Sequence, residues 1–257
     1  MAGIGTRISR ACYRVIFSIV RLVSPRYALR GTENLPEGAC VLVGNHSQMY
    51  GPIAAEIYTP GPHRVWCAGE MMAWREVPAY SFSDFWSKKP ASVRWLYRIA
   101  SYLITPLSVC VFNNAHTIPV YHDARGMITF RRTLQSLSAG ERVVIFPECY
   151  MKHNNIVYAF RKEFVDVGRM YARREGKPLP FVPFYVCPKL ATMTFGEPVF
   201  PNAAADPAED RARVCRALQD GITAMALAQP PHTVVPYPNM PKKEYPGSHP
   251  LMTYDLS

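Results

Sequence analysis

Short apolar runs alternate along this chain with longer segments of helical period. An unbroken apolar run fits a strand buried on both faces, and apolar residues three or four positions apart fit one face of a helix. The predicted strands lie at residues 27–31, 40–44, 109–112, 117–121, 142–146, 181–186 and 193–195. The predicted helices lie at residues 126–139, 156–176 and 206–228. Strands that alternate with helices predict an α/β fold, here a single domain whose largely parallel mixed central sheet is flanked by helices.

The first 26 residues form a separate amphipathic segment. Its residues segregate by kind when they are placed at about 100° per residue. One side, within about 60°, holds Arg7, Arg10, Arg14 and Arg21, and the opposite side holds Ile8, Cys12, Val15, Ile16, Ile19 and Val23. Such a helix lies in a membrane interface, or it packs its apolar side on the core and keeps its arginines in water. The pattern does not separate these two interpretations.

The positive charge of the chain is concentrated in the same region. The net charge is +10, and six arginines, with no acidic residue before Glu33, contribute +6 of it within the first thirty positions. A basic excess attracts nucleic acid or anionic lipid. Nucleic acid is bound through basic residues mixed with exposed aromatic residues or through a recognised module, and this segment offers neither. We therefore expect an anionic membrane surface as a partner and no nucleic acid.

The apolar segments are too short to predict a membrane span. The best candidate, residues 99–112, has fourteen uncharged residues, fewer than the roughly 20 that a spanning helix needs, and predicts a buried or interfacial element. Arg14 and Arg21 leave only six uncharged residues between them, which argues against a secretory signal. The seven cysteines are scattered and never spaced C-x-x-C, as expected of reduced thiols in a cytoplasmic protein. The expected location is cytoplasmic and peripherally associated with the membrane.

Proline sets off the end of the chain. The last 29 residues, from Gln229, contain seven prolines, which excludes a regular helix or a central strand. This tail either wraps over the domain or is disordered. The predicted division is therefore a membrane-surface helix at residues 1–26, an α/β domain at 27–228 and a proline-rich tail at 229–257.

One histidine stands where the predicted sheet would bind a ligand. Asn45-His46-Ser47 directly follow the strand at residues 40–44, and open α/β sheets bind ligands outside the carboxyl ends of their strands. An acceptor hydroxyl that attacks a thioester must lose its proton, usually to a histidine. A carboxylate then fixes the tautomer of that histidine, and a cation holds a phosphorylated acceptor.

Four segments, in order, resemble the conserved blocks of the phospholipid/glycerol acyltransferases (1-acylglycerol-3-phosphate acyltransferase-like). They are Val-Leu-Val-Gly-Asn-His-Ser at 41–47, Ile-Pro-Val-Tyr-His at 118–122, Val-Ile-Phe-Pro-Glu at 144–148 and Phe-Val-Pro-Phe at 181–184, followed by Phe-Gly-Glu-Pro-Val at 195–199. The resemblance covers about residues 27–228. It implies a glycerol-3-phosphate acyltransferase-like fold and transfer of a fatty acyl group from acyl-CoA or acyl carrier protein to a lysophospholipid, with His46 as general base and no metal or cofactor.

The chain departs from that family at three charged positions. Gly51 stands where the family has the aspartate that pairs with the catalytic histidine. His122 replaces the arginine that ends the second block, and Cys-Tyr-Met at 149–151 replaces Gly-Thr-Arg. Since three charges are missing together, the resemblance implies altered chemistry or an altered substrate.

Other residues are candidates to replace the missing groups. Glu148 is the preferred partner of His46, with Asp123 and Glu56 as weaker candidates. The remaining predicted substrate-binding residues are Asn45, Gly51, His122, Arg125, Phe146, Pro147, Lys152 and His153. Among them Lys152, His153, His122 and Arg125 are the candidates for the anion site. Glu148 is equally interpreted as a structural anchor that bonds backbone amides.

The sequence leaves two alternative functions open. The first is a catalytically degenerate protein of the same fold that binds lipid or acyl carrier, which the glycine at 51 favours. The second is a thioesterase in which Cys149 is the nucleophile and His46 its base. The apolar residues at 66–97 fit a core, a membrane-contact surface or an acyl-chain groove.

Overall fold

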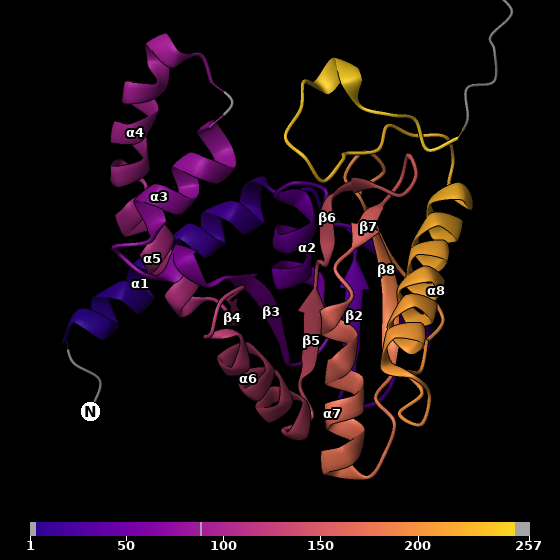
Figure 1. Cartoon of the computed structure of the whole chain (residues 1–257). Helices are drawn as coiled ribbons and strands as arrows, with labels where there is room; N and C mark the ends of the chain where they lie inside the picture. The colour runs from indigo at the N-terminus through magenta and orange to yellow at the C-terminus, as the bar shows by residue number, and fades with distance from the viewer. Residues whose placement is uncertain (1–3, 88, 250–257) are drawn as a thin grey trace, which may run out of the picture. The chain divides into compact units, whose positions relative to one another are not determined.

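The computed structural model describes residues 4–87 and 89–249. Within them, seven strands form a mixed sheet in the order β1-β9-β8-β2-β5-β3-β4, and β6 and β7 form a separate hairpin (Figure 1). The strands are β1 (Ala28–Arg30), β2 (Val41–Gly44), β3 (His63–Ala68), β4 (Thr117–Val120), β5 (Arg142–Ile145), β6 (Glu148–Lys152), β7 (Tyr158–Phe160), β8 (Phe181–Cys187) and β9 (Thr192–Phe195). The α-helices are α1 (Ile4–Val23), α2 (Tyr50–Tyr58), α3 (Val77–Ser81), α4 (Arg94–Leu103), α5 (Thr105–Asn114), α6 (Gly126–Ser138), α7 (Asp166–Glu175) and α8 (Pro207–Leu227). The predicted α/β fold with a largely parallel mixed sheet flanked by helices is confirmed.

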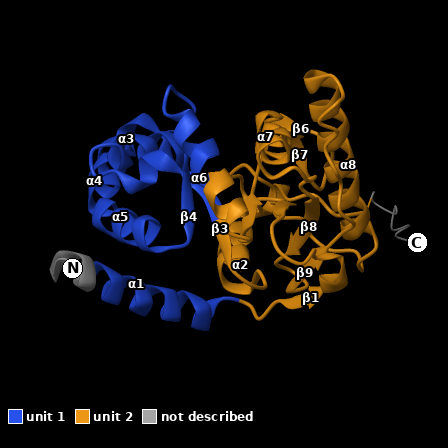
Figure 2. Cartoon of the chain, turned by 90° about the horizontal axis from the view of Figure 1, so that it is seen from below, with its two compact units in different colours: residues 1–24, 65–132 blue, residues 25–64, 133–257 orange. Residues whose placement is uncertain are grey.

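The contacts of the chain divide it into two compact units (Figure 2). Unit 1 contains residues 1–24 and 65–132, and unit 2 contains residues 25–64 and 133–257. Each unit is therefore assembled from two separate stretches of sequence. The loop that carries His46 and the segment that carries Glu148 both belong to unit 2.

The core of unit 2 is built around β2. Val41, Leu42 and Val43 are fully buried, and β2 pairs in parallel with β5 on one side and with β8 on the other. All seven residues of β8 are buried, and α8 packs along this strand. Strands buried on both faces need apolar residues at every position, which is why their apolar runs were visible in the sequence.

Two predicted elements are wrong. Residues 109–112 lie in α5, not in a strand, because a short apolar run has no period that distinguishes a buried strand from part of a helix. The helix predicted at 156–176 is confined to α7, and residues 158–160 form β7. Asn154 turns the chain before β7 by accepting hydrogen bonds from the amides of Ile156 and Val157 at 2.8 and 2.9 Å. Strand β3 was not predicted.

The described part of the proline-rich tail wraps over unit 2 (Figure 1, yellow). Thr233 and Gly247 form an isolated antiparallel bridge, and the amide of Val234 donates to the carbonyl of Pro246 at 2.9 Å. Wrapping, one of the two predicted states, therefore describes residues 229–249. Residues 250–257 lie outside the described residues.

Unit 1 exposes apolar side chains on two helices. On α1, Val15, Ile19, Leu22 and Val23 are exposed, and on α4 the exposed apolar residues are Trp95, Leu96, Ile99, Tyr102 and Leu103. Helix α1 is held to α5 by Asn114, whose Nδ2 donates to Ser9 Oγ at 2.7 Å. Among the described residues, no single helix has the length and apolarity to cross a membrane. One pair, Ala91–Leu103 and Thr105–Asn114, meets that criterion by length and composition but is bent by 42°.

Candidate functional site

Asn45 ties the end of β2 to the neighbouring strand β8. Its side-chain amide donates to the carbonyl of Val186 at 3.0 Å and accepts from the amide of Val186 at 2.7 Å. The same Nδ2 donates to Ser47 Oγ at 2.6 Å. Asn45 is only 1% exposed. These contacts occupy the side chain within the protein, so Asn45 positions the loop; its predicted contact with substrate stays a prediction.

The chain turns sharply after His46. Ser47 and Gln48 both adopt the left-handed backbone conformation, with φ of 46° and 54°. Two consecutive non-glycine residues in this region store strain of order 1–3 kcal/mol each, and such strain gathers at functional sites. The turn closes when the amides of Tyr50 and Gly51 donate to the carbonyls of Ser47 and His46 at 3.0 and 3.1 Å. Helix α2 therefore starts directly against the His46 loop.

Gly51 lies at the closest approach between α2 and that loop. A Cβ at this position would lie 2.4 Å from the carbonyl oxygen of His46 and 2.7 Å from that of Asn45. Backbone atoms cannot move away as a flexible side chain does. The geometry of this turn therefore requires glycine where the resembling family has aspartate, and no residue of α2 at position 51 can supply a carboxylate without moving the loop.

Glu148 holds the main chain of His46 and does not reach its ring. Its Oε1 accepts from the backbone amide of His46 at 2.6 Å, and its Oε2 accepts from the amide of Tyr158 in β7 at 2.7 Å. Burial raises the pKa of Glu148 to about 7, and the two amide donors act in the opposite direction. The predicted pairing of this carboxylate with the imidazole is absent, and the geometry matches the alternative of an anchor that bonds backbone amides.

The imidazole of His46 is half-buried among aromatic rings. The rings of Phe146 and Tyr237 lie edge-on to it, each with a centroid separation of 5.4 Å. Its Nδ1 is buried and has no hydrogen-bond partner among the described residues. Burial lowers the pKa of His46 below 6.5, and the backbone of Gln48 and of His46 itself opposes part of that shift. The ring is therefore neutral at neutral pH, the form that accepts a proton.

The segment after β5 supplies several other predicted residues. Phe146 contacts both His46 and Phe184, the latter at a centroid separation of 5.7 Å. Pro147 is buried, and its carbonyl accepts from the amide of Arg161 at 2.9 Å. Lys152, the last residue of β6, is exposed, as is His153. The structure thus brings Asn45, His46, Gly51, Phe146 and Glu148 together and leaves the two anion-site candidates of unit 2 in solvent.

His122 and Arg125 belong to unit 1. The guanidinium of Arg125 donates to Asp123 and Glu76, with Nε–Oδ2 and Nη1–Oε1 distances of 3.0 and 2.9 Å. It also lies 4.1 Å from the centroid of the Tyr121 ring. Because two carboxylates already surround it, Arg125 is a poor anion anchor, and Asp123 is engaged with Arg125. His122 is exposed.

The remaining candidates are distributed over other elements. Cys149 is half-buried in β6, directly after Glu148, and Glu56 is half-buried in α2. Among the described residues, no group of three or more His, Cys, Asp or Glu side chains is arranged to hold a metal ion.

The sequence did not point to three residues near His46, which are Gln48, Tyr237 and Tyr245. Tyr237 comes from the proline-rich tail, and its ring also contacts Tyr150 and Tyr158, at centroid separations of 5.4 and 6.1 Å. Gln48 joins the same region through Tyr245 Oη at 2.9 Å. For Tyr237 and Tyr245, the signal in the sequence was the presence of aromatic residues in a tail otherwise rich in proline.

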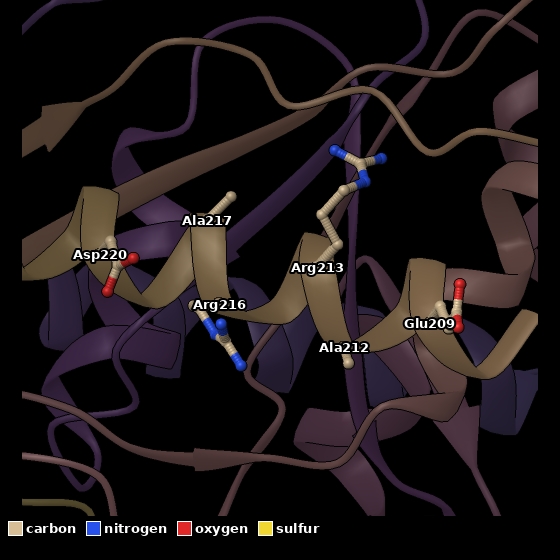
Figure 3. A pocket seen from close by; sticks show the side chains of 6 residues that line it. All are labelled: Glu209, Ala212, Arg213, Arg216, Ala217 and Asp220. Carbon is tan, nitrogen blue, oxygen red and sulfur yellow. The ribbon is translucent and has the colours of Figure 1, made fainter. Parts of the chain in front are cut away.

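An open hollow of about 500 Å³ lies on α8 (Figure 3). Its lining consists of Glu209, Ala212, Arg213, Arg216, Ala217 and Asp220. None of these was a predicted site residue. Two carboxylates accompany the two arginines, so the hollow offers no concentrated positive charge to an anionic acceptor.

The fold and the site together define an α/β protein with a strained, tightly anchored histidine loop at the carboxyl end of a central strand. In sequence, the chain matches no family model and no curated protein. Among solved structures it is similar to the 1-acyl-sn-glycerophosphate (LPA) acyltransferase PlsC from Thermotoga maritima, with a TM-score of 0.46 at 16% sequence identity. That similarity covers 85% of this chain and 78% of the other. It is a likeness of fold, and it assigns no substrate to this chain.

Proposed function

We propose that this protein is an acyltransferase that uses His46 as general base to move a fatty acyl group from a thioester to a hydroxyl. The observation that carries the proposal is the state of the His46 ring. It is neutral at neutral pH because burial lowers its pKa, and it sits on a loop fixed by Asn45 and Glu148. A base held in one place and in its proton-accepting form is what attack by a hydroxyl requires.

The reaction needs one proton shuttle and no redox partner. Nε2 of His46 takes the proton of the acceptor hydroxyl while the oxygen attacks the thioester carbonyl. The tetrahedral intermediate then collapses, the C–S bond breaks, and the imidazolium returns the proton to the leaving thiolate. Nδ1 has no carboxylate partner, and loss of such a partner lowers the kcat of a serine protease about 10⁴-fold. Since enzymes accelerate reactions by about 10⁶-fold or more, we expect slow but measurable turnover.

The donor and acceptor classes follow from the sequence resemblance. We propose acyl-CoA or acyl carrier protein as donor and a lysophospholipid (1-acylglycerol-3-phosphate-like) as acceptor. Lys152 and His153 are exposed beyond Glu148 on the same hairpin, where the ammonium of Lys152 offers a point charge and the ring of His153 a hydrogen-bond donor to a phosphate. Lys152→Ala is therefore expected to raise the KM for a phosphorylated acceptor and to leave the KM for a neutral acceptor unchanged. An equal effect on both acceptors would remove Lys152 from this role.

A second candidate function is supported by the same residues. The glycine at 51 is required by the turn, and Glu148 bonds backbone amides. Neither position therefore gives the imidazole a carboxylate partner. A protein that binds acyl thioester or lipid without turning it over would tolerate both features.

Transfer of a labelled acyl group to a panel of lysophospholipids distinguishes these functions. Transfer that is lost in His46→Ala but retained in His116→Ala, which removes an exposed histidine with no proposed role, supports the acyltransferase. Donor binding with no turnover in the wild type supports the binding protein and overturns the proposal. Donor hydrolysis that is lost in Cys149→Ala would instead indicate a thioesterase.

We also propose that the protein works in the cytoplasm at an anionic membrane surface, from which a lysophospholipid would be taken. The exposed apolar residues of α1 and α4 belong to the same unit, and neither Ile4–Val23 nor Arg94–Leu103 contains an acidic residue. Apolar side chains that accompany arginines and no carboxylates suit the interface of an anionic bilayer.

A further inference from the structure

The C-terminal segment at residues 230–249, here called the strap, returns to its own starting point. The amide of His232 donates to Ser248 Oγ at 3.1 Å, and the amide of Ser248 donates to the carbonyl of His232 at 2.9 Å. Thr233 and Gly247 pair next to this contact. The two ends of the strap are therefore pinned together, and the residues between them form a closed loop.

The pinned base of the strap is attached to the core of unit 2. Nε2 of His232 lies 2.8 Å from Tyr185 Oη, and Nδ1 lies 2.7 Å from the carbonyl oxygen of Pro230. A carbonyl only accepts hydrogen bonds, so Nδ1 donates to the Pro230 oxygen, and Nε2 shares the other hydrogen bond with the Tyr185 hydroxyl. Tyr185 is a buried residue of β8, with 1% of its surface exposed. The base of the strap is thus fixed to a central strand.

The far part of the strap meets the His46 loop. The ring of Tyr237 lies edge-on to the His46 ring at 5.4 Å with an interplanar angle of 73°. Gln48, one of the two left-handed residues of the loop, donates through Nε2 to Tyr245 Oη at 2.9 Å and to the carbonyl of Pro238 at 3.3 Å. The Tyr245 hydroxyl returns a contact to Gln48 Oε1 at 3.2 Å. The strap therefore contacts the His46 ring itself and Gln48, two residues after it.

The two parts of the strap differ in how firmly they are held. The base is secured by buried hydrogen bonds to the core, whereas Gln48, Tyr237 and Tyr245 are all half-buried. Contacts at half-buried positions open locally at lower cost than contacts to a buried strand. The geometry therefore allows the far part to lift while the base stays in place.

We propose that the strap is the gate of the His46 site and that Tyr237 is the residue that determines access to its ring. Tyr237 packs edge-on against the imidazole, so movement of its ring would widen the approach of a hydroxyl-bearing acceptor to His46. The role in acceptor selection rests on the proposed function, but the covering of His46 does not. This gives the proline-rich tail a specific task, since proline limits the conformations between which the strap moves.

Modification of histidines by diethyl pyrocarbonate tests the covering directly, because the reagent acylates accessible neutral imidazoles. The rate at His46 is measured in the full chain by peptide mass spectrometry, with the exposed His122 and His153 as internal references. Tyr237→Ala is expected to raise the rate at His46 about threefold to tenfold, the effect of losing one aromatic pair. Tyr237→Phe keeps the ring and should keep the wild-type rate. Phe200→Ala, which removes an exposed aromatic residue of unit 2, is the matched control and should change nothing.

Equal rates at His46 in the wild type and in Tyr237→Ala would overturn the proposal. If Tyr237→Ala fails to fold, Tyr245→Phe decides, because it removes only the hydroxyl that bonds Gln48. It should raise the rate at His46 about threefold, and an unchanged rate contradicts the gate. Acyl transfer is then assayed with acceptors of increasing size, and Tyr237→Ala should lower KM most for the largest. Absence of transfer in the wild type would refute the proposed function. The modification rates would still show whether the strap covers His46.

Discussion

At position 51 the side chain is limited by the backbone of residues five and six positions earlier. The carbonyl oxygens of His46 and Asn45 lie 2.4 and 2.7 Å from where a Cβ would be, and both belong to a loop tied to β8 and to Glu148. The glycine at position 51 is therefore fixed by its surroundings. The surrounding turn is built for glycine.

Introducing an aspartate by Gly51→Asp is expected to destabilise the protein without making it more active. The new side chain forces the His46 loop away from its anchors, which we expect to lower the free energy of unfolding by roughly 1–3 kcal/mol, as for overpacked sites, and not to raise acyl transfer. Urea denaturation and the transfer assay check the two effects. Gly126→Ala is the control, because its nearest atom, the carbonyl oxygen of Tyr121, is 3.4 Å from the added Cβ. Higher activity in Gly51→Asp would contradict this account of the turn.

Glu148 makes the stability of unit 2 depend on pH. Its pKa is raised from 4.5 to about 7, so between these values the folded chain holds a proton that the unfolded chain has released. The contribution of Glu148 to the free energy of unfolding therefore declines as pH rises from about 4.5 to about 7, by about 3 kcal/mol in total.

Glu148→Gln should remove this pH dependence and, at any pH, leave one of the two amides without an acceptor, at a cost of roughly 1–3 kcal/mol. The free energy of unfolding in urea between pH 5 and pH 8 is the measurement. Glu209→Gln, at an exposed position of α8, should leave the pH dependence as it is in the wild type. If Glu148→Gln shows the same slope with pH as the wild type, the carboxyl does not titrate in this range.

At the scale of elements, α4 places apolar side chains where a soluble helix would carry polar ones. Trp95, Leu96, Ile99, Tyr102 and Leu103 are between 49% and 76% exposed. A membrane surface would cover them, with Arg94 and Arg98 near the lipid headgroups.

Ile99→Glu is expected to weaken binding to anionic vesicles about tenfold to a hundredfold, the effect of no longer burying one large aliphatic side chain. Co-sedimentation with vesicles measures this. Met127→Glu introduces the same charge at an exposed apolar position of α6 and should bind as the wild type does. Equal loss in both variants would indicate a charge effect that is not specific to α4.

At the scale of the whole molecule, the N-terminal helix belongs with residues far from it in sequence. Unit 1 joins residues 1–24 to 65–132, and the contacts between α1 and α5 include hydrogen bonds of Ser9 with Cys110 and Asn114. The helix thus contributes to the structure of unit 1 as well as to its exposed apolar surface.

Removal of residues 1–24 is accordingly expected to loosen α5 and to leave β2 and β8 protected. Hydrogen exchange followed by mass spectrometry should show faster exchange over Thr105–Asn114 and unchanged exchange over Val41–Gly44 and Phe181–Cys187. If exchange increases equally in both units, α1 supports the entire fold and not unit 1 in particular.

The sequence by itself determined the elements that are buried on both faces and the position of His46 at the end of one of them. Strands β2, β5 and β8 are recognisable in the sequence because their buried positions are apolar. A histidine two residues after β2 lies at the edge where α/β sheets bind ligands. Local spacing also predicted α6 and α8. It failed for residues 109–112, where a short apolar run has no period to interpret. It also failed for residues 156–165, where apolar residues at helical spacing form β7 and a short 3-10 helix instead.

Only the tertiary structure decided which atoms meet His46. Glu148 lies 102 residues from His46 along the chain and bonds its backbone amide, not its ring. The residue types alone do not tell these two contacts apart. Gly51 is required because two carbonyl groups approach it, and Tyr237 reaches the imidazole because the strap is pinned at His232 and Ser248. Contacts of this kind depend on the angles and distances set by the complete fold, whereas sequence patterns report only which side chains prefer to be buried.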